Sequence, residues 1–142
     1  SLMLSAARLG ADVVVASPPG YAPNPDVVGQ AQGLAAAAGS TVTITTVPEE
    51  AVTGANAVYT DVWTSMGSEN EAERRRKAFC GYQVDEKLFS LAAPGAVFMH
   101  CLPAHRGEEV TDAVIESQQS VVFDQAENRL HAQKALLLMM ID

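Results

Sequence analysis

The 142-residue sequence has few cysteines, few basic residues and no long hydrophobic run. Its two cysteines, Cys80 and Cys101, cannot build a disulfide scaffold, so we expect a reducing environment. Nine basic residues against seventeen acidic ones give a net charge of −8, which opposes binding to nucleic acid. The longest apolar run, residues 135–141, is far shorter than the ~20 residues of a membrane-spanning helix. Neither a nucleic acid nor a membrane is therefore an expected partner.

Several common catalytic motifs are also missing. The sequence contains no GxGxxG, GxxxxGK[ST], CxxC, HExxH or GxSxG pattern. His100, Cys101 and His105 lie close together, but neighbouring strand residues point to opposite faces, so we do not expect a zinc site. A Cys101–His105 nucleophile pair is a further alternative, although no oxyanion-binding or third-group signal accompanies it. The sequence thus predicts neither a metal nor a cofactor.

What the sequence does contain is an alternation of short apolar runs and helical segments. One domain is expected from the length. Apolar, β-branched runs predict five strands, at residues 12–17, 41–47, 57–60, 96–100 and 120–124. Helices are expected at residues 1–9, 25–38, 48–54, 69–79, 85–91, 108–116 and from 125 to the end. Strands that alternate with helices predict an α/β fold, with a parallel sheet covered by helices on both faces.

Chemically useful side chains follow three of the predicted strands. Ligands of an open parallel sheet bind beyond the carboxyl ends of its strands, where Asp61, Cys101 and Arg129 are expected to meet. Each has an ordinary alternative role. Asp61 could cap a turn, Cys101 could be a small buried side chain, and Arg129 could pair with Asp124 or Glu127 on the surface. Together, an acid, a thiol and a guanidinium predict a ligand site, with Arg129 suited to a phosphate.

Four sequence strings carry a resemblance to a known family. They are YTDVWTSMG (59–67), GYQV (81–84), HCLP with RGEEV (100–110) and VFDQAENRLHAQKALL (122–137). In this order, they make the whole chain resemble the C-terminal, ornithine-binding half of ornithine carbamoyltransferase. The resemblance implies a Rossmann-like parallel sheet with helices on both faces, the second domain of the aspartate/ornithine carbamoyltransferase fold. It also implies a trimeric homo-oligomer for the full-length enzyme.

The same resemblance implies a reaction and its residues. The family transfers the carbamoyl group of carbamoyl phosphate to the δ-amine of L-ornithine, giving citrulline and phosphate, in arginine biosynthesis or the urea cycle. Asp61 and Cys101 match the expected catalytic pair, and the SMG triplet favours ornithine over acetylated, succinylated or diamine analogues. The implied substrate-binding positions are Asp61, Ser65, Met66, Cys101, Leu102 and Arg129.

The chain differs from the family by lacking the carbamoyl-phosphate half and the strand that should precede Ser1. We therefore expect residues 1–124 to form the ornithine-binding domain, and residues 125–142 a helix that packs on the missing N-terminal domain. That helix should expose Leu130, Leu136, Leu137 and Met140. Weak or no turnover is expected from the chain alone. The alternative is a non-catalytic fragment that binds an amino acid or a partner chain, and the expected compartment is the cytoplasm, or the mitochondrial matrix in a eukaryote.

Overall fold

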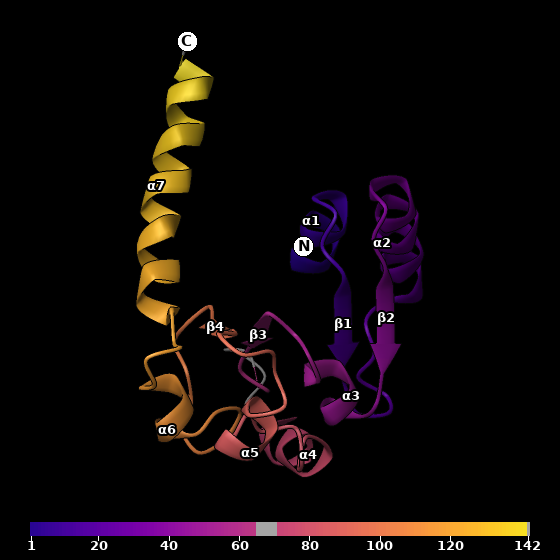
Figure 1. The fold of residues 1–142 in the computed structure, drawn as a ribbon, viewed down its shortest axis with the longest axis vertical. Coiled ribbons are helices and arrows are strands. Elements are labelled where there is room, and N and C mark those ends of the chain that lie inside the picture. Colours follow the sequence, from indigo (N-terminus) through magenta and orange to yellow (C-terminus); the bar gives the residue numbers. More distant parts are fainter. Residues whose placement is uncertain (65–70, 142) are drawn as a thin grey trace. The chain divides into compact units, whose positions relative to one another are not determined.

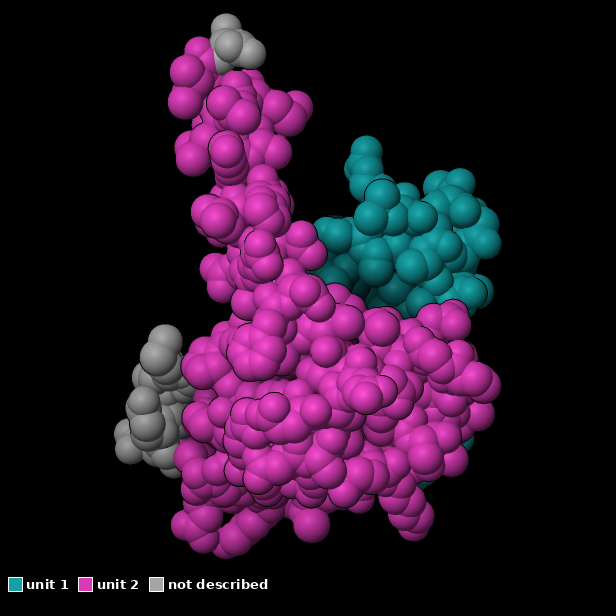
Figure 2. Space-filling model, turned by 60° about the vertical axis from the view of Figure 1, so that its left-hand side comes forward, with its two compact units in different colours: residues 1–51 teal, residues 52–142 magenta. Residues whose placement is uncertain are grey.

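A computed structural model of the chain describes residues 1–64 and 71–141, which divide into two compact units. Figure 1 shows the elements in chain order, and Figure 2 colours unit 1 (residues 1–51) teal and unit 2 (residues 52–142) magenta. Unit 1 contains α1 (Leu2–Arg8), β1 (Val13–Ala16), α2 (Pro25–Ala38) and β2 (Val42–Thr45), and α3 (Pro48–Val52) lies at the boundary. Unit 2 contains β3 (Ala57–Thr60), α4 (Ala72–Ala78), α5 (Glu86–Phe89), β4 (Val97–His100), α6 (Asp112–Ile115) and α7 (Val122–Ile141).

The described strands pair in parallel, as the alternation of strands and helices predicts. They form two two-stranded sheets, β1–β2 and β3–β4, one in each unit. In the second sheet Ala57 is paired with Val97 and Thr60 with His100, so both strands end at the same level. This shared end places the residues after β3 and β4 next to one another.

The predicted fifth strand, residues 120–124, is wrong. Ser120 makes a single isolated bridge to Phe98, and α7 begins at Val122, which is 1% exposed. A short apolar run looks the same in sequence whether it is a buried strand or the buried first turn of a helix. Arg129 consequently does not follow a strand and lies about two turns into α7.

The predicted helix at 108–116 is also shorter in the structure. Only Asp112–Ile115 is helical, with the Thr111 hydroxyl accepting the N–H of Val114 as an N-cap. Before Thr111 the chain forms hydrogen-bonded turns, in which Gly107 N–H donates to the Val110 carbonyl. These turns have a role in the site described below.

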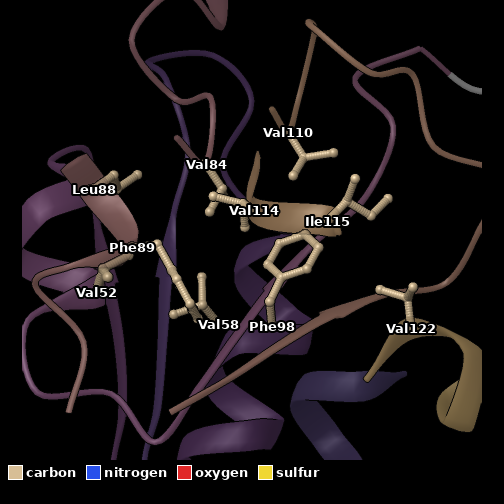
Figure 3. Close-up of a cluster of buried hydrophobic side chains, with 10 residues drawn as sticks. All are labelled: Val52, Val58, Val84, Leu88, Phe89, Phe98, Val110, Val114, Ile115 and Val122. Carbon is tan, nitrogen blue, oxygen red and sulfur yellow. The ribbon is translucent and has the colours of Figure 1, made fainter. Parts of the chain in front are cut away.

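The core of unit 2 lies on one face of the β3–β4 sheet. Val58 of β3 and Phe98 of β4 are paired and both buried, and α5 and α6 add the apolar side chains that cover them. Figure 3 shows this cluster: Val52, Val58, Val84, Leu88, Phe89, Phe98, Val110, Val114, Ile115 and Val122. Side chains at alternate positions of β3 and β4 point to the other face, away from this core.

Helix α7 is exposed along most of its length. Every residue from 126 to 141 is exposed, including the four apolar residues named from the sequence: Leu130 (64%), Leu136 (59%), Leu137 (60%) and Met140 (80%). The exposure expected of this helix is therefore confirmed. Among the described helices, none combines the length and the apolar character that crossing a bilayer requires.

In unit 1, α2 begins with a side-chain cap that can be tested. The Asn24 carboxamide oxygen accepts the N–H of Asp26 at 2.8 Å and of Val27 at 3.4 Å. Asn24→Ala should lower the free energy of unfolding by about 1 kcal/mol, because these two N–H groups lose their acceptor. Urea titration followed by far-UV circular dichroism measures this loss. Asn24→Asp keeps an acceptor and serves as the control; equal losses in both variants would contradict the capping role.

Candidate functional site

The candidate site is built on the ends of β3 and β4. Asp61 and Cys101 are the first residues after these paired strands, and both continue the face opposite the core. The Cys101 thiol donates to Asp61 Oδ1 at 3.0 Å, and the Val62 N–H donates to the same oxygen at 2.7 Å. The structure thus brings together two of the residues that the sequence analysis selected.

Cys101 is held as a neutral thiol. Partial burial raises its pKa, a hydrogen bond from Tyr59 lowers it, and the neighbouring Asp61 carboxylate raises it again, with a net upward shift. A thiol with a raised pKa is a poor nucleophile at neutral pH, because the thiolate is the reactive form. This environment suits a hydrogen-bonding role and argues against the Cys101–His105 nucleophile pair.

Leu102 adopts an unusual backbone conformation next to the thiol. Its φ of 54° lies in the left-handed region, and its peptide bond to Pro103 is cis. The Leu102 N–H donates to His100 Nδ1 at 2.8 Å. Non-glycine residues in this region of φ/ψ space cluster at functional sites, where the surrounding structure holds them. Here the fully buried His100 ring is the group that holds Leu102.

Glu109 lies behind His100 and is also fully buried. His100 Nδ1 accepts the Leu102 N–H, so the proton of the neutral ring is on Nε2, 3.3 Å from Glu109 Oε1 but not aligned for a hydrogen bond. The same Glu109 oxygen accepts the His105 N–H at 2.6 Å. The carboxylate therefore holds the backbone at His105 and lies against the buried His100 ring at the end of β4.

The turns that carry Glu109 are fixed by the segment GYQV, residues 81–84. Val84 N–H donates to the Glu109 carbonyl at 2.9 Å, and the Gln83 carboxamide donates to the Glu108 carbonyl at 2.6 Å. Thr111 N–H donates back to the Val84 carbonyl at 3.2 Å. This short bridge explains how GYQV contributes to the site without supplying a side chain that reaches Cys101.

Aromatic side chains fix the segment that follows Asp61. The Trp63 ring stacks on Phe79 with centroids 5.8 Å apart, and Phe79 meets Tyr82 edge-on at the same distance. Arg75 of α4 also donates to the Trp63 carbonyl at 3.3 Å. Trp63 is thus attached to α4 and to the residue that follows this helix.

The other predicted site residues are placed differently. Ser65 and Met66 lie outside the described residues. Arg129 is exposed on α7, and no contact joins it to Asp61 or Cys101 in the part of the chain that is described. The surface ion pair considered for Arg129 is also not formed, since Glu127 instead lies 3.4 Å from His131 Nε2.

One group of potential metal ligands lies near the site. The ligand atoms of His105, Glu108 and Glu109 all lie within 4.8 Å of one another. However, Glu108 already pairs with Arg76 at 2.8 Å, and Glu109 accepts the His105 N–H. Glu108 and one oxygen of Glu109 are therefore already engaged by protein groups, and we assign no metal to the group.

Two residues of the site did not emerge from the sequence analysis, namely Tyr59 and Glu109. Tyr59 could have been found, because in a strand residue 59 shares a face with residue 61. Glu109 carried no usable signal. Its burial depends on turns between residues 105 and 110 that were expected to be partly helical.

Comparisons with known proteins agree with the fold and the sequence strings. Residues 1–140 match the family described as the aspartate/ornithine carbamoyltransferase Asp/Orn-binding domain. The chain is similar to the ornithine carbamoyltransferase of Symbiobacterium thermophilum, with 61% identity over 99% of this chain and 46% of that protein. It is also similar to the solved ornithine carbamoyltransferase of Pyrococcus furiosus, with a TM-score of 0.91 and 58% identity over 96% of this chain and 44% of the other. The anabolic enzyme of Campylobacter jejuni has a TM-score of 0.92 at 40% identity, over 98% of this chain and 46% of the other. The chain therefore spans slightly less than half the length of these relatives.

Proposed function

Because this chain belongs to the aspartate/ornithine carbamoyltransferase family, as its Asp/Orn-binding domain, we propose that it supplies the ornithine site of an ornithine carbamoyltransferase. The proposed reaction transfers the carbamoyl group of carbamoyl phosphate to the δ-amine of L-ornithine and releases citrulline and phosphate. The observation that carries the proposal is the 3.0 Å contact between the Cys101 thiol and Asp61 at the common end of two parallel strands.

The chemistry of the pair fits an attacking amine. An alkyl ammonium has a pKa near ~10.4 in water, so the δ-amine of ornithine must lose a proton before it can attack the carbamoyl carbon. The Asp61 carboxylate is exposed and attracts the ammonium group, while the neutral Cys101 thiol adds a hydrogen-bonding group beside it. The Leu102 carbonyl, in its left-handed conformation, is the proposed acceptor that aligns the amine or the carbamoyl NH₂. We assign no single general base between Asp61 and Cys101.

The proposal gives Arg129 and α7 a role outside this chain. Arg129 is exposed and makes no ion pair within the described residues, so its guanidinium is available to a phosphate. We propose that the apolar surface of residues 125–142 packs on the part of the protein that binds carbamoyl phosphate, and that residues 1–124 form the ornithine domain. From the resemblance to ornithine carbamoyltransferase we also propose a cytoplasmic homotrimer for the full-length protein, with Ser65 and Met66 contacting ornithine.

Complementation tests this function. We expect little or no citrulline from this chain alone, because nothing in it matches the carbamoyl-phosphate half. Co-expression with the part of the Symbiobacterium thermophilum relative that this chain does not cover should restore citrulline formation in a steady-state colorimetric assay. The uncovered part alone is the control. If the two parts form a stable complex that never makes citrulline, the transferase proposal is wrong.

The second candidate is a non-catalytic fragment that binds an amino acid or a partner chain. The exposed apolar residues of α7 favour partner binding. The two candidates predict different effects of Cys101→Ala. A binding fragment should keep its affinity for ornithine, measured by calorimetry, and have no activity to lose, whereas a transferase should lose most of its activity.

A further inference from the structure

β4 has backbone neighbours on both of its edges, but on one edge the pairing stops before the strand does. β3 pairs with the first edge along the whole strand, up to His100. On the other edge Phe98 N–H donates to the Gln119 carbonyl at 2.8 Å, and Val121 N–H donates to the Phe98 carbonyl at 3.0 Å. If this parallel pairing continued, the next bond would join His100 N–H to the Val121 carbonyl, because the bonds of a parallel ladder are evenly spaced.

The Gln125 side chain takes the place of that backbone acceptor. The Val121 carbonyl accepts the Gln125 N–H at 2.8 Å, as the residue before a helix does, and so turns toward α7 instead of β4. His100 N–H instead donates to Gln125 Oε1 at 3.1 Å. Because His100 is fully buried, its N–H has no access to water, and the Gln125 oxygen satisfies it. A backbone donor also requires that the carboxamide atom facing it is the oxygen.

Gln125 also connects two parts of the proposed site. It is half-buried, whereas all later residues of α7 are exposed, so it faces β4 from the start of the helix. Arg129 follows four residues later, on the same side of the helix. His100, in turn, immediately precedes Cys101. One hydrogen bond thus joins the helix that carries Arg129 to the strand end that carries Cys101.

We propose that Gln125 is a positioning residue of the carbamoyl-transfer site, whose side chain fixes the end of β4 and so holds Cys101 and Leu102 in place. The proposal rests on the transferase function above, because it adds a residue to the same site. His100 transmits the effect, since its ring accepts the Leu102 N–H at 2.8 Å while its own N–H is bound by Gln125. Without the Gln125 oxygen, a buried N–H would lose its partner and the last residue of β4 would be held by β3 alone.

Amide hydrogen exchange tests the bond directly in the full chain. Gln125→Met keeps the length of the side chain and removes the acceptor. Exchange of the His100 N–H, followed by NMR of the isotope-labelled chain, should become about tenfold faster or more, because the amide is no longer held by a hydrogen bond. Gln125→Glu keeps an acceptor oxygen and should restore the protection. Gln133→Met makes the same change at an exposed position of α7 and should leave exchange at His100 unchanged.

The reacting groups should respond to the same substitution. With Cys80→Ser, Cys101 is the single thiol, and its alkylation by iodoacetamide is followed by mass spectrometry. Gln125→Met should accelerate this alkylation about threefold or more, because the thiol leaves its partly buried position beside Asp61. In the enzyme reassembled with the uncovered part of a relative, kcat for citrulline formation should fall about tenfold while KM for ornithine changes little, since the reacting groups lose their alignment. Gln125→Glu should restore both the alkylation rate and kcat.

Unchanged exchange at His100 in a folded Gln125→Met variant would overturn the proposal, and so would an unchanged alkylation rate. If that variant does not fold, Gln125→Glu decides. A carboxylate is the stronger acceptor, so the His100 amide proton should resonate downfield of its position in the parent chain. An unmoved resonance would equally overturn the proposal. The exchange, alkylation and resonance measurements use neither ornithine nor carbamoyl phosphate, so their failure is distinct from a failure to form citrulline.

Discussion

Asp61→Asn is expected to lower kcat for citrulline formation by about 10²- to 10⁴-fold in the enzyme reassembled from this chain and the uncovered part of a relative. Asparagine has the size of aspartate, and its carboxamide oxygen can still accept the Cys101 thiol and the Val62 N–H. The substitution therefore removes the negative charge while it preserves the local geometry. That charge attracts the δ-ammonium group, and the carboxylate can accept a proton, which the carboxamide of asparagine cannot.

A matched control separates this charge from the overall acidity of the chain. Asp112→Asn removes an exposed carboxylate of the same unit, whose partner is Arg106 at 2.7 Å. An exposed ion pair of this kind contributes about 1 kcal/mol or less, so citrulline formation should be unchanged. Steady-state kinetics with ornithine varied at saturating carbamoyl phosphate provide both comparisons. An Asp61→Asn enzyme within about threefold of the parent would remove Asp61 from the proposed mechanism.

Glu109→Ala is expected to destabilise unit 2 by about 2 to 4 kcal/mol, because two donors lose the oxygen they face. The His105 N–H donates to Glu109 Oε1 at 2.6 Å, and His100 Nε2 lies 3.3 Å from the same oxygen in a fully buried environment. Removing the carboxylate also leaves a cavity behind His100. The loss should appear as a lower urea midpoint in near- and far-UV circular dichroism.

The adjacent glutamate offers a close control for this effect. Glu108 is partly exposed and pairs with Arg76 at 2.8 Å near the surface. Glu108→Ala should therefore cost about 1 kcal/mol or less. Similar losses in the two variants would show that the buried position of Glu109 has no special role. In the reassembled enzyme Glu109→Ala should also reduce activity, because His100 holds Leu102 beside the reacting groups.

Helices and strands were predicted correctly where the residues that define them are neighbours in the sequence. Pro25 and Gly39 delimit α2, and the β-branched runs at 13–16, 42–45 and 57–60 are strands. The strand predicted at residues 120–124 was wrong because an apolar run buried by tertiary packing has the same composition in a strand as in the first turn of a helix. The helix predicted from residue 108 began too early for a related reason. The turns at residues 105–110 are stabilised by contacts with Val84, which lies 25 positions away from Glu109.

Some features of the candidate site could likewise be predicted from the sequence, and others required the tertiary structure. The sequence by itself determined the family, the α/β class and the positions of Asp61 and Cys101 at strand ends, because parallel strands bring their carboxyl ends to a common edge. Only the tertiary structure decided that the Cys101 thiol is bonded to Asp61, and that His100 and Glu109 support the turn at Leu102. Those contacts depend on strand register and on the path of a loop. Both are set by packing between segments far apart in the chain, which a local pattern of residues does not encode.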